Sequence, residues 1–167
     1  MTAGTIGAVM LGLASVQQAR APLTMAPDQC PTVMTAAGSI GAPLTAAGSA
    51  AAAPALAIGP RSRVTLLPAA GVRFAIAPGH VPGAGTRGGL VALAVAAPGR
   101  YRIGLSGPAW IDVVRGAAAV PSVGHGHGDP CSPLRKLVDF DLVPGRYLIQ
   151  LADSAAPDLW VAVMRQP

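Results

Sequence analysis

The chain has 167 residues, which suits one domain, and 51% of them are hydrophobic, enough for a packed core. Its 21 glycines, 17 prolines and low charged fraction of 11% favour many turns and argue against long amphipathic helices. The net charge of +5 could attract an anionic partner such as nucleic acid or lipid headgroups, but the arginines are scattered without forming a basic stripe, so nucleic acid is not expected.

Residues 1–21 have the features of a secretory signal. The apolar run 6–16 is too short to span a bilayer, and Ala19-Arg20-Ala21 provides a small-residue cleavage pattern. The segment before the apolar run lacks Lys and Arg, so the alternative is an ordinary buried stretch. No later segment is long and apolar enough to be a membrane helix. We therefore predict a protein that is periplasmic or secreted and does not span the membrane.

Residues 22–60 are dominated by Ala, Pro, Gly, Ser and Thr, and the sequence Thr-Ala-Ala-Gly-Ser occurs at 35–39 and again at 45–49. Small side chains bury too little area to offset the entropy of ordering the chain. This composition predicts a low-complexity linker or arm. The sequence leaves open whether the arm is disordered or packs on an edge strand.

Residues 61–167 have the pattern of a β-sandwich. Short apolar runs alternate with Pro and Gly, and within several runs apolar and polar residues alternate, which is typical of antiparallel strands with one face in water. The fold class we expect is all-β: an antiparallel sandwich of about eight strands, Greek-key or jelly-roll-like, after an N-terminal low-complexity arm. The expected strands are 63–67, 72–77, 90–96, 101–105, 110–115, 138–142, 147–151 and 159–164.

A longer repeat lies within this domain. Pro-Gly-Arg-Tyr occurs at 98–101 and again 46 residues later at 144–147, and each copy is followed by a strand that contains a tryptophan. Pro and Gly together favour a turn. We expect Tyr101 and Tyr147 to enter the core with their hydroxyls bonded to nearby backbone, like the tyrosine corner of Greek-key sandwiches.

The two cysteines, Cys30 and Cys131, are the first candidates for a covalent link. In an oxidising compartment an isolated pair most simply forms one disulfide, which would tie the arm to the segment 124–131. The alternative is that Cys131 is a metal ligand.

The sequence Gly-His-Gly-His-Gly-Asp-Pro-Cys at 124–131 is the most unusual local feature. His125, His127, Asp129 and Cys131 carry groups that suit Zn or Cu, and His80 in another Pro/Gly segment could add a ligand. The spacing is no standard metal motif, so a solvent-exposed connecting loop is the alternative. Acid–base catalysis by the histidines is a third.

Other polar and aromatic residues have simpler interpretations. Asp139 and Asp141 share a strand face, which could serve a glycosidase, but a solvated face beside Arg135 and Lys136 is the expectation. Asp112 is either a buried carboxylate with its bonds satisfied or an anchor for a glycine-rich loop. The chain carries no nucleophile elbow, P-loop or dinucleotide-binding fingerprint.

Trp110 and Trp160 are the remaining aromatic candidates. Either one could bind a sugar if it is exposed. Core packing is the expectation for both.

Gly-x-Tyr followed by alternating apolar residues, and then a hairpin into a strand with Asp112, resembles the pre-peptidase C-terminal type of secreted β-sandwich over roughly residues 88–164. Members of that family are mostly accessory, non-catalytic modules of exported enzymes. The resemblance implies an exported binding or structural module without enzymatic activity.

A narrower resemblance is carried by Trp110-Ile-Asp-Val-Val, His125-Gly-His-Gly, Cys131, Arg135-Lys136 and Pro144-Gly-Arg-Tyr147. These motifs are similar to small exported bacterial proteins that often carry the label homogentisate 1,2-dioxygenase. The true dioxygenases hold iron with two His and one Glu, and this chain has no Glu, so that triad cannot be carried over.

Together these observations predict an exported, non-enzymatic β-sandwich that binds an unidentified ligand or has a structural role, and that needs no cofactor. One alternative is a metalloprotein that uses the Gly/His segment to hold Zn, Cu or Fe, with oxidoreductase or dioxygenase activity. The other is a module that binds carbohydrate or another component of the cell envelope.

Overall fold

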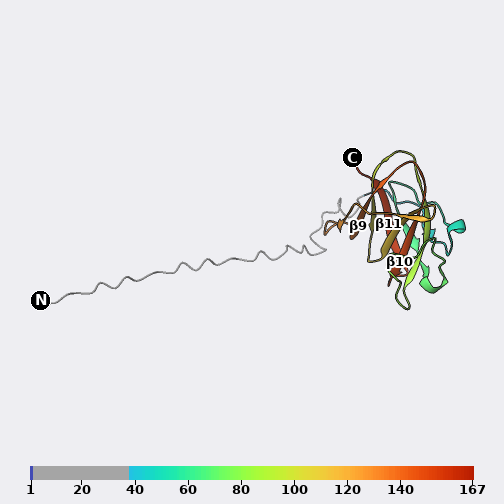
Figure 1. Ribbon diagram of the computed structural model, residues 1–167, viewed down its shortest axis with the longest axis horizontal. Helices are drawn as coiled ribbons and strands as arrows, with labels where there is room; N and C mark the ends of the chain where they lie inside the picture. Colours follow the sequence, from blue (N-terminus) through green and yellow to red (C-terminus); the bar gives the residue numbers. More distant parts are fainter. Residues whose placement is uncertain (2–37) are drawn as a thin grey trace.

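The structure, a computed structural model, describes Met1 and residues 38–167, which form two packed β-sheets (Figure 1). The expected signal (apart from Met1), most of the expected arm and Cys30 lie outside the described residues. The strands are β1 Leu44–Thr45, β2 Arg61–Thr65, β3 Leu67–Pro68, β4 Arg87–Val95, β5 Gly99–Leu105, β6 Trp110–Arg115, β7 Ala118–Val120, β8 Gly124–His127, β9 Lys136–Leu142, β10 Gly145–Ser154 and β11 Asp158–Arg165. Two single-turn 3-10 helices complete the described part, η2 Ala50–Ala52 and η3 Ala69–Gly71.

The all-β sandwich is confirmed, with eleven strands among the described residues in place of about eight. One sheet, called sheet A here, has the order β1-β2-β11-β5-β9-β8, and the other, sheet B, has the order β3-β4-β10-β6-β7. All pairings between neighbours are antiparallel except β1 with β2. Among the described residues, no helix has the length and apolar character needed to cross a bilayer.

The long strands form two equivalent units that exchange partners. The unit β4-β5-β6 places its middle strand in sheet A and its outer strands in sheet B, whereas β9-β10-β11 does the reverse. Consequently β5 lies between β9 and β11, and β10 lies between β4 and β6. The consecutive strands β10 and β11, both labelled in Figure 1, belong to different sheets. The two copies of Pro-Gly-Arg-Tyr begin the two central strands.

The core lies between the sheets and is built by alternate residues of the central strands. Phe140 of β9, Ile103 of β5, Ile149 of β10 and Val113 of β6 are each at most 2% exposed. Their neighbours along the strands point to the outer faces. Burial of this continuous apolar layer is the main stabilising contribution to the fold.

The two repeat units begin with equivalent corners. The Tyr101 hydroxyl donates to the Ala97 carbonyl at 2.8 Å, and the Tyr147 hydroxyl donates to the Val143 carbonyl at 2.8 Å. Gly99 and Gly145 both have a φ of 154°, within the region that L side chains rarely adopt. Each corner also receives an arginine from the neighbouring strand of its own sheet. Arg165 donates to the Pro98 carbonyl, and Arg115 donates to the Pro144 carbonyl.

The prediction of a strand at 72–77 is wrong, because this segment is a loop over the outer face of sheet B. The fully buried Gln150 side chain of β10 accepts hydrogen bonds from the backbone N–H groups of Ala75 and Ile76 and donates to the Ile76 carbonyl. One amide side chain therefore supplies the bonds that a neighbouring strand would have supplied.

The segment 124–131, expected to be a Gly/His loop, is a strand in its first half. Residues 124–127 form β8, the edge strand of sheet A, paired antiparallel with β9. The pairing places two glycines and two histidines in a regular strand, with alternate side chains on opposite faces.

Residues 40–58 run along the sandwich and pair with both sheets. Besides β1, isolated bridges join Ile40 to Arg61, Ala47 to Leu90, Ala55 to Ala92 and Ile58 to Val163. Ala46 and Leu56 of this segment are buried in the core. This part of the low-complexity sequence therefore contributes to the packed domain.

Candidate functional site

The register of β8 places its two histidines on the face that looks toward sheet B. His125 lies opposite Val138 and His127 lies opposite Lys136. Directly paired residues of neighbouring strands point to the same side of the sheet, and Val138 belongs to the core between the sheets. Because β8 is an edge strand, these positions reach solvent, and both histidines are exposed.

Two hollows meet at this edge of the sandwich, and we name them by their residues. The Trp110 hollow has a volume of about 280 Å³ and is lined by Trp110, Ile111, Ser122, His125, Lys136 and Val138. The histidine hollow has a volume of about 600 Å³ and is lined by Gly107, Pro108, His125, Gly126, His127, Arg135, Lys136 and Leu137. His125 and Lys136 line both, so the hollows are neighbouring parts of one site.

Trp110 forms an aromatic wall that is 38% exposed and held in a fixed orientation. Its Nε1–H donates to Asp112 Oδ1 at 2.8 Å. The His80 ring stacks on it with centroids 5.7 Å apart and an interplanar angle of 29°. The Lys136 ammonium lies 5.5 Å from the centroid of the same ring, which is a cation–π distance.

Lys136, the only lysine of the chain, connects the two hollows. Its Nζ donates to the Ala109 carbonyl at 2.6 Å, which fixes the ammonium beside Trp110. Burial lowers the pKa of Lys136 from its ordinary value, because the surrounding protein hydrates the charge less well than water does. The ammonium is therefore partly desolvated and can interact strongly with a bound group.

Asp112 and Asp153 anchor the Pro/Gly loop that carries His80. Asp112 Oδ2 accepts from the Gly79 N–H at 3.1 Å, and Asp153 Oδ1 accepts from the Gly83 N–H at 2.9 Å. His80 Nε2 lies 3.1 Å from Asp153 Oδ2. A side chain at position 79 would lie 2.9 Å from Trp110 Nε1, so glycine is required for this close approach. Asp112 therefore anchors the loop that contains Gly79, and it does not anchor the segment 124–128.

The structure does not bring the expected metal ligands together into one group. His125 and His127 share one face of β8, whereas Asp129 follows the strand and accepts a hydrogen bond from the Cys131 N–H at 2.9 Å. His80 is engaged with Asp153 and Trp110. Within the part of the chain that the structure describes, no three His, Cys, Asp or Glu side chains are grouped so as to hold a metal ion.

Cys131 is buried, with 6% of its surface exposed. Its expected partner Cys30 lies outside the described residues, so the disulfide stays a prediction.

Asp139 and Asp141 lie on the outer face of sheet A, where each forms an ion pair with an arginine of β5. The partners are Arg102 and Arg100. The expected neighbours were Arg135 and Lys136. Hydrogen bonds from these guanidinium groups lower the pKa of both carboxyls below the ordinary 3.8. A glycosidase acid requires the opposite shift. This face is therefore a ladder of ion pairs.

The expectation that both tryptophans pack in the core is wrong. Trp110 is exposed, and Trp160 lies half-buried outside the core cluster, with the Arg61 guanidinium 5.5 Å from its ring centroid. Trp160 pairs with Arg63 across the neighbouring strand, on the outer face of sheet A. The two tryptophans thus occupy different surfaces.

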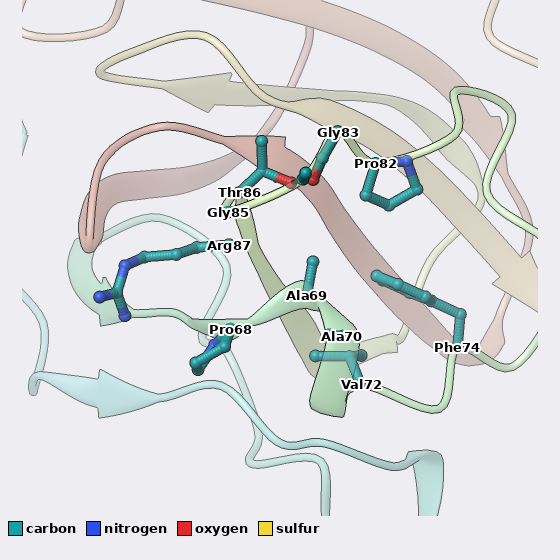
Figure 2. A pocket seen from close by; sticks show the side chains of 11 residues that line it. Pro68, Ala69, Ala70, Val72, Phe74, Pro82, Gly83, Gly85, Thr86 and Arg87 are labelled. Atoms are coloured by element: carbon teal, nitrogen blue, oxygen red, sulfur yellow. Dashed lines mark hydrogen bonds between the residues drawn. The ribbon is translucent and has the colours of Figure 1, made fainter.

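A further hollow of about 480 Å³ lies between η3 and the loop before β4, shown in Figure 2. Most of its lining side chains are apolar, among them the Phe74 ring, and the Arg87 side chain points away from its centre (Figure 2). The Thr86 hydroxyl already donates to the Gly83 carbonyl at 2.7 Å. Unlike the site at Trp110, this hollow has no histidine or lysine in its lining.

Comparison with known proteins adds no relative: no protein-family model, no curated protein and no solved structure matches this chain.

The sequence indicated His125 and His127 but missed Lys136 and Ser122 as parts of their site. A strand pairing of 124–127 with 136–139 would have placed Lys136 opposite His127. The available signal was the single lysine of the chain, directly after Arg135.

Proposed function

We propose that this chain is an exported, non-enzymatic β-sandwich module that binds a polysaccharide through Trp110 and the hollows beside it. The main support is that Trp110 is exposed at the wall of a hollow, while a hydrogen bond to Asp112 and stacking with His80 hold its ring in place. Export rests on the signal-like features of residues 1–21. The resemblance to accessory modules of exported enzymes supports a binding role without catalysis.

A fixed indole ring suits the binding of sugars for two physical reasons. Its flat apolar face can cover the C–H face of a sugar ring, which removes apolar surface of both partners from water. Because the orientation of Trp110 is already set, binding orders few additional side-chain torsions. Polar groups around the ring, such as the Ser122 hydroxyl and the His125 imidazole, can bond to sugar hydroxyls.

The test compares Trp110→Ala with Trp160→Ala in binding to a panel of neutral and acidic cell-envelope polysaccharides. Both changes remove one indole, but only the first removes the wall of the hollow. We expect binding to weaken at least about tenfold in Trp110→Ala, equivalent to ~1.4 kcal/mol, and to persist in Trp160→Ala. Thermal melting of both variants checks that the fold is kept.

The proposal would be refuted by a failure of the unaltered protein to bind any polysaccharide of the panel. Equal binding by Trp110→Ala and the unaltered protein would also refute it, since the site would then lie elsewhere.

Metal binding is the second candidate function, favoured by the placement of His125 and His127 on one strand face two residues apart. Zn, Cu or Fe could be held by two such imidazoles together with other ligands. The positive charges of Arg135 and Lys136 on the lining of the same hollow oppose a cation there. Polysaccharide binding measured before and after treatment with a chelator separates the two candidates.

A further inference from the structure

The lining of the two hollows carries an excess of positive charge. Arg135, Lys136, His125 and His127 line the histidine hollow, and no carboxylate of the described residues lines either hollow. The nearest acids have other partners. Asp112 accepts from the Trp110 Nε1–H and the Gly79 N–H, Asp129 accepts from the Cys131 N–H, and Asp139 lies on the opposite sheet face with Arg102. The site therefore keeps a positive potential that no side chain of its lining neutralises.

The strand register also brings basic side chains directly opposite each other. His127 and Lys136 are paired residues of β8 and β9, so their Cβ atoms lie roughly 5 Å apart on the same face. Neither residue has an acidic side chain opposite it in this pairing. An anion bound between them could contact both side chains.

Both imidazoles are available to a ligand. Among the described residues, no side-chain hydrogen bond or ion pair engages the imidazole of His125 or His127, and both residues are exposed. Lys136 is already oriented by the Ala109 carbonyl and the Trp110 ring. The site thus presents one fixed ammonium and the His125 imidazole at the Trp110 hollow, with the His127 imidazole in the neighbouring histidine hollow.

We infer that the polysaccharide bound at this site is acidic, with carboxylate-bearing sugar rings whose rings stack on Trp110 and whose carboxylates contact Lys136, His125 and His127. This inference rests on the proposed polysaccharide-binding function and specifies its ligand. Nucleic acid fits less well, because a strand of bases requires a basic groove and successive aromatic platforms, whereas this site has one tryptophan. An anionic membrane surface fits less well than a soluble chain, because the site is a hollow.

The experiment uses Trp160→Phe, which leaves Trp110 as the only tryptophan and so makes its fluorescence report on the site. The probes are an oligogalacturonate of fixed length and its methyl ester, which has the same sugar rings without the negative charges. We expect the acidic form to bind at least about tenfold more tightly than the ester, which corresponds to ~1.4 kcal/mol. We also expect this preference to shrink as the salt concentration rises, because salt screens exposed charges.

Two further variants in the same background assign the preference to the site. His125→Gln/His127→Gln removes two exposed imidazoles and should weaken binding of the acidic probe several-fold more than binding of the ester, which loses only the contact of His125 with a sugar hydroxyl. Arg146→Gln is the matched control, because it removes one positive charge from an exposed position on β10 that lines neither hollow. It should keep the full preference.

Equal binding of the acidic probe and its ester would overturn the inference and leave the proposed function standing. An equal loss of preference in Arg146→Gln and the double histidine variant would also overturn it, since net charge alone would then explain the effect. A protein that binds neither probe but retains another polysaccharide of the panel refutes the acidic ligand alone. Failure with the entire panel refutes the proposed function itself.

Discussion

At the scale of single residues, Arg102 and Asp139 form the least exposed of the ion pairs among the described residues. Two hydrogen bonds, Nε to Oδ1 at 2.7 Å and Nη2 to Oδ2 at 2.8 Å, join them across β5 and β9. The neighbouring pair, Arg100 with Asp141, has similar bonds, but its side chains are 51% and 58% exposed against 36% and 13%. Since water screens exposed charges, the two pairs should contribute differently.

We predict a coupling free energy of about 1 kcal/mol between Arg102 and Asp139, and a smaller one between Arg100 and Asp141. The measurement is a double-mutant cycle for each pair, with Arg→Met and Asp→Asn, in urea denaturation. The second pair is the matched control, because it joins the same two strands two residues away. A larger coupling for the more exposed pair would contradict the prediction.

At the scale of elements, the two corners differ in the number of bonds made by the tyrosine. Tyr147 donates to the Val143 carbonyl and also accepts from the Val143 N–H at 3.2 Å, whereas Tyr101 donates only to the Ala97 carbonyl. Both rings are buried, so replacement by Phe keeps the packing and removes the hydroxyl.

We predict that Tyr101→Phe lowers the free energy of unfolding by about 1 kcal/mol and that Tyr147→Phe lowers it by up to about 2 kcal/mol. Urea denaturation of the two variants measures both values under the same conditions. The reverse order of the two losses would show that the second bond to Val143 contributes nothing to stability.

The predictability of an element depends on where its hydrogen-bond partners lie in the chain. The Pro-Gly-Arg-Tyr corners could be predicted from the sequence, because each tyrosine hydroxyl bonds to the carbonyl four residues before it. The apolar alternation at 72–77 was misleading, because the side chain that satisfies its backbone is Gln150, more than 70 residues away. The glycines of 124–127 likewise suggested a loop, and only the pairing with β9 makes this segment a strand.

The candidate site was predictable in part for the same reason. His125 and His127 stand out as neighbours in the sequence, so they could be singled out together. Trp110 and Lys136 join them only through the strand register and the packing of β6 near the β8–β9 edge. The basic, aromatic character of the site therefore arises from the fold and could not be predicted from any single segment.

At the scale of the whole molecule, three arginine–aspartate pairs lie on the outer face of sheet A. Hydrogen bonds from Arg102, Arg100 and Arg63 lower the pKa of Asp139, Asp141 and Asp158 respectively below the ordinary 3.8. The chain contains seven aspartates and no glutamate, so these three carboxyls are a large share of its acids. The acid sensitivity of the sandwich should therefore depend strongly on this one face.

We predict that the free energy of unfolding falls as the pH drops below about 4. The folded carboxyls have the lower pKa, so on acidification the unfolded chain takes up protons first, and proton uptake by the unfolded state favours unfolding. The contribution of the three pairs is complete above the ordinary pKa of 3.8 and is lost as the pH passes down through the lowered values of the folded protein. Urea midpoints measured from pH 5 to pH 2 follow this loss.

A variant with Arg63, Arg100 and Arg102 changed to Gln isolates the cause. Without the guanidinium groups the aspartates of the folded protein return toward the pKa of the unfolded chain, so the decline below about pH 4 should become shallower even though the variant starts less stable. The matched control removes three arginines that form no ion pair with a carboxylate in the described part of the chain, Arg115, Arg146 and Arg165, and should keep the original slope. Equal slopes for the unaltered protein and the first variant would show that acid unfolding arises outside this face.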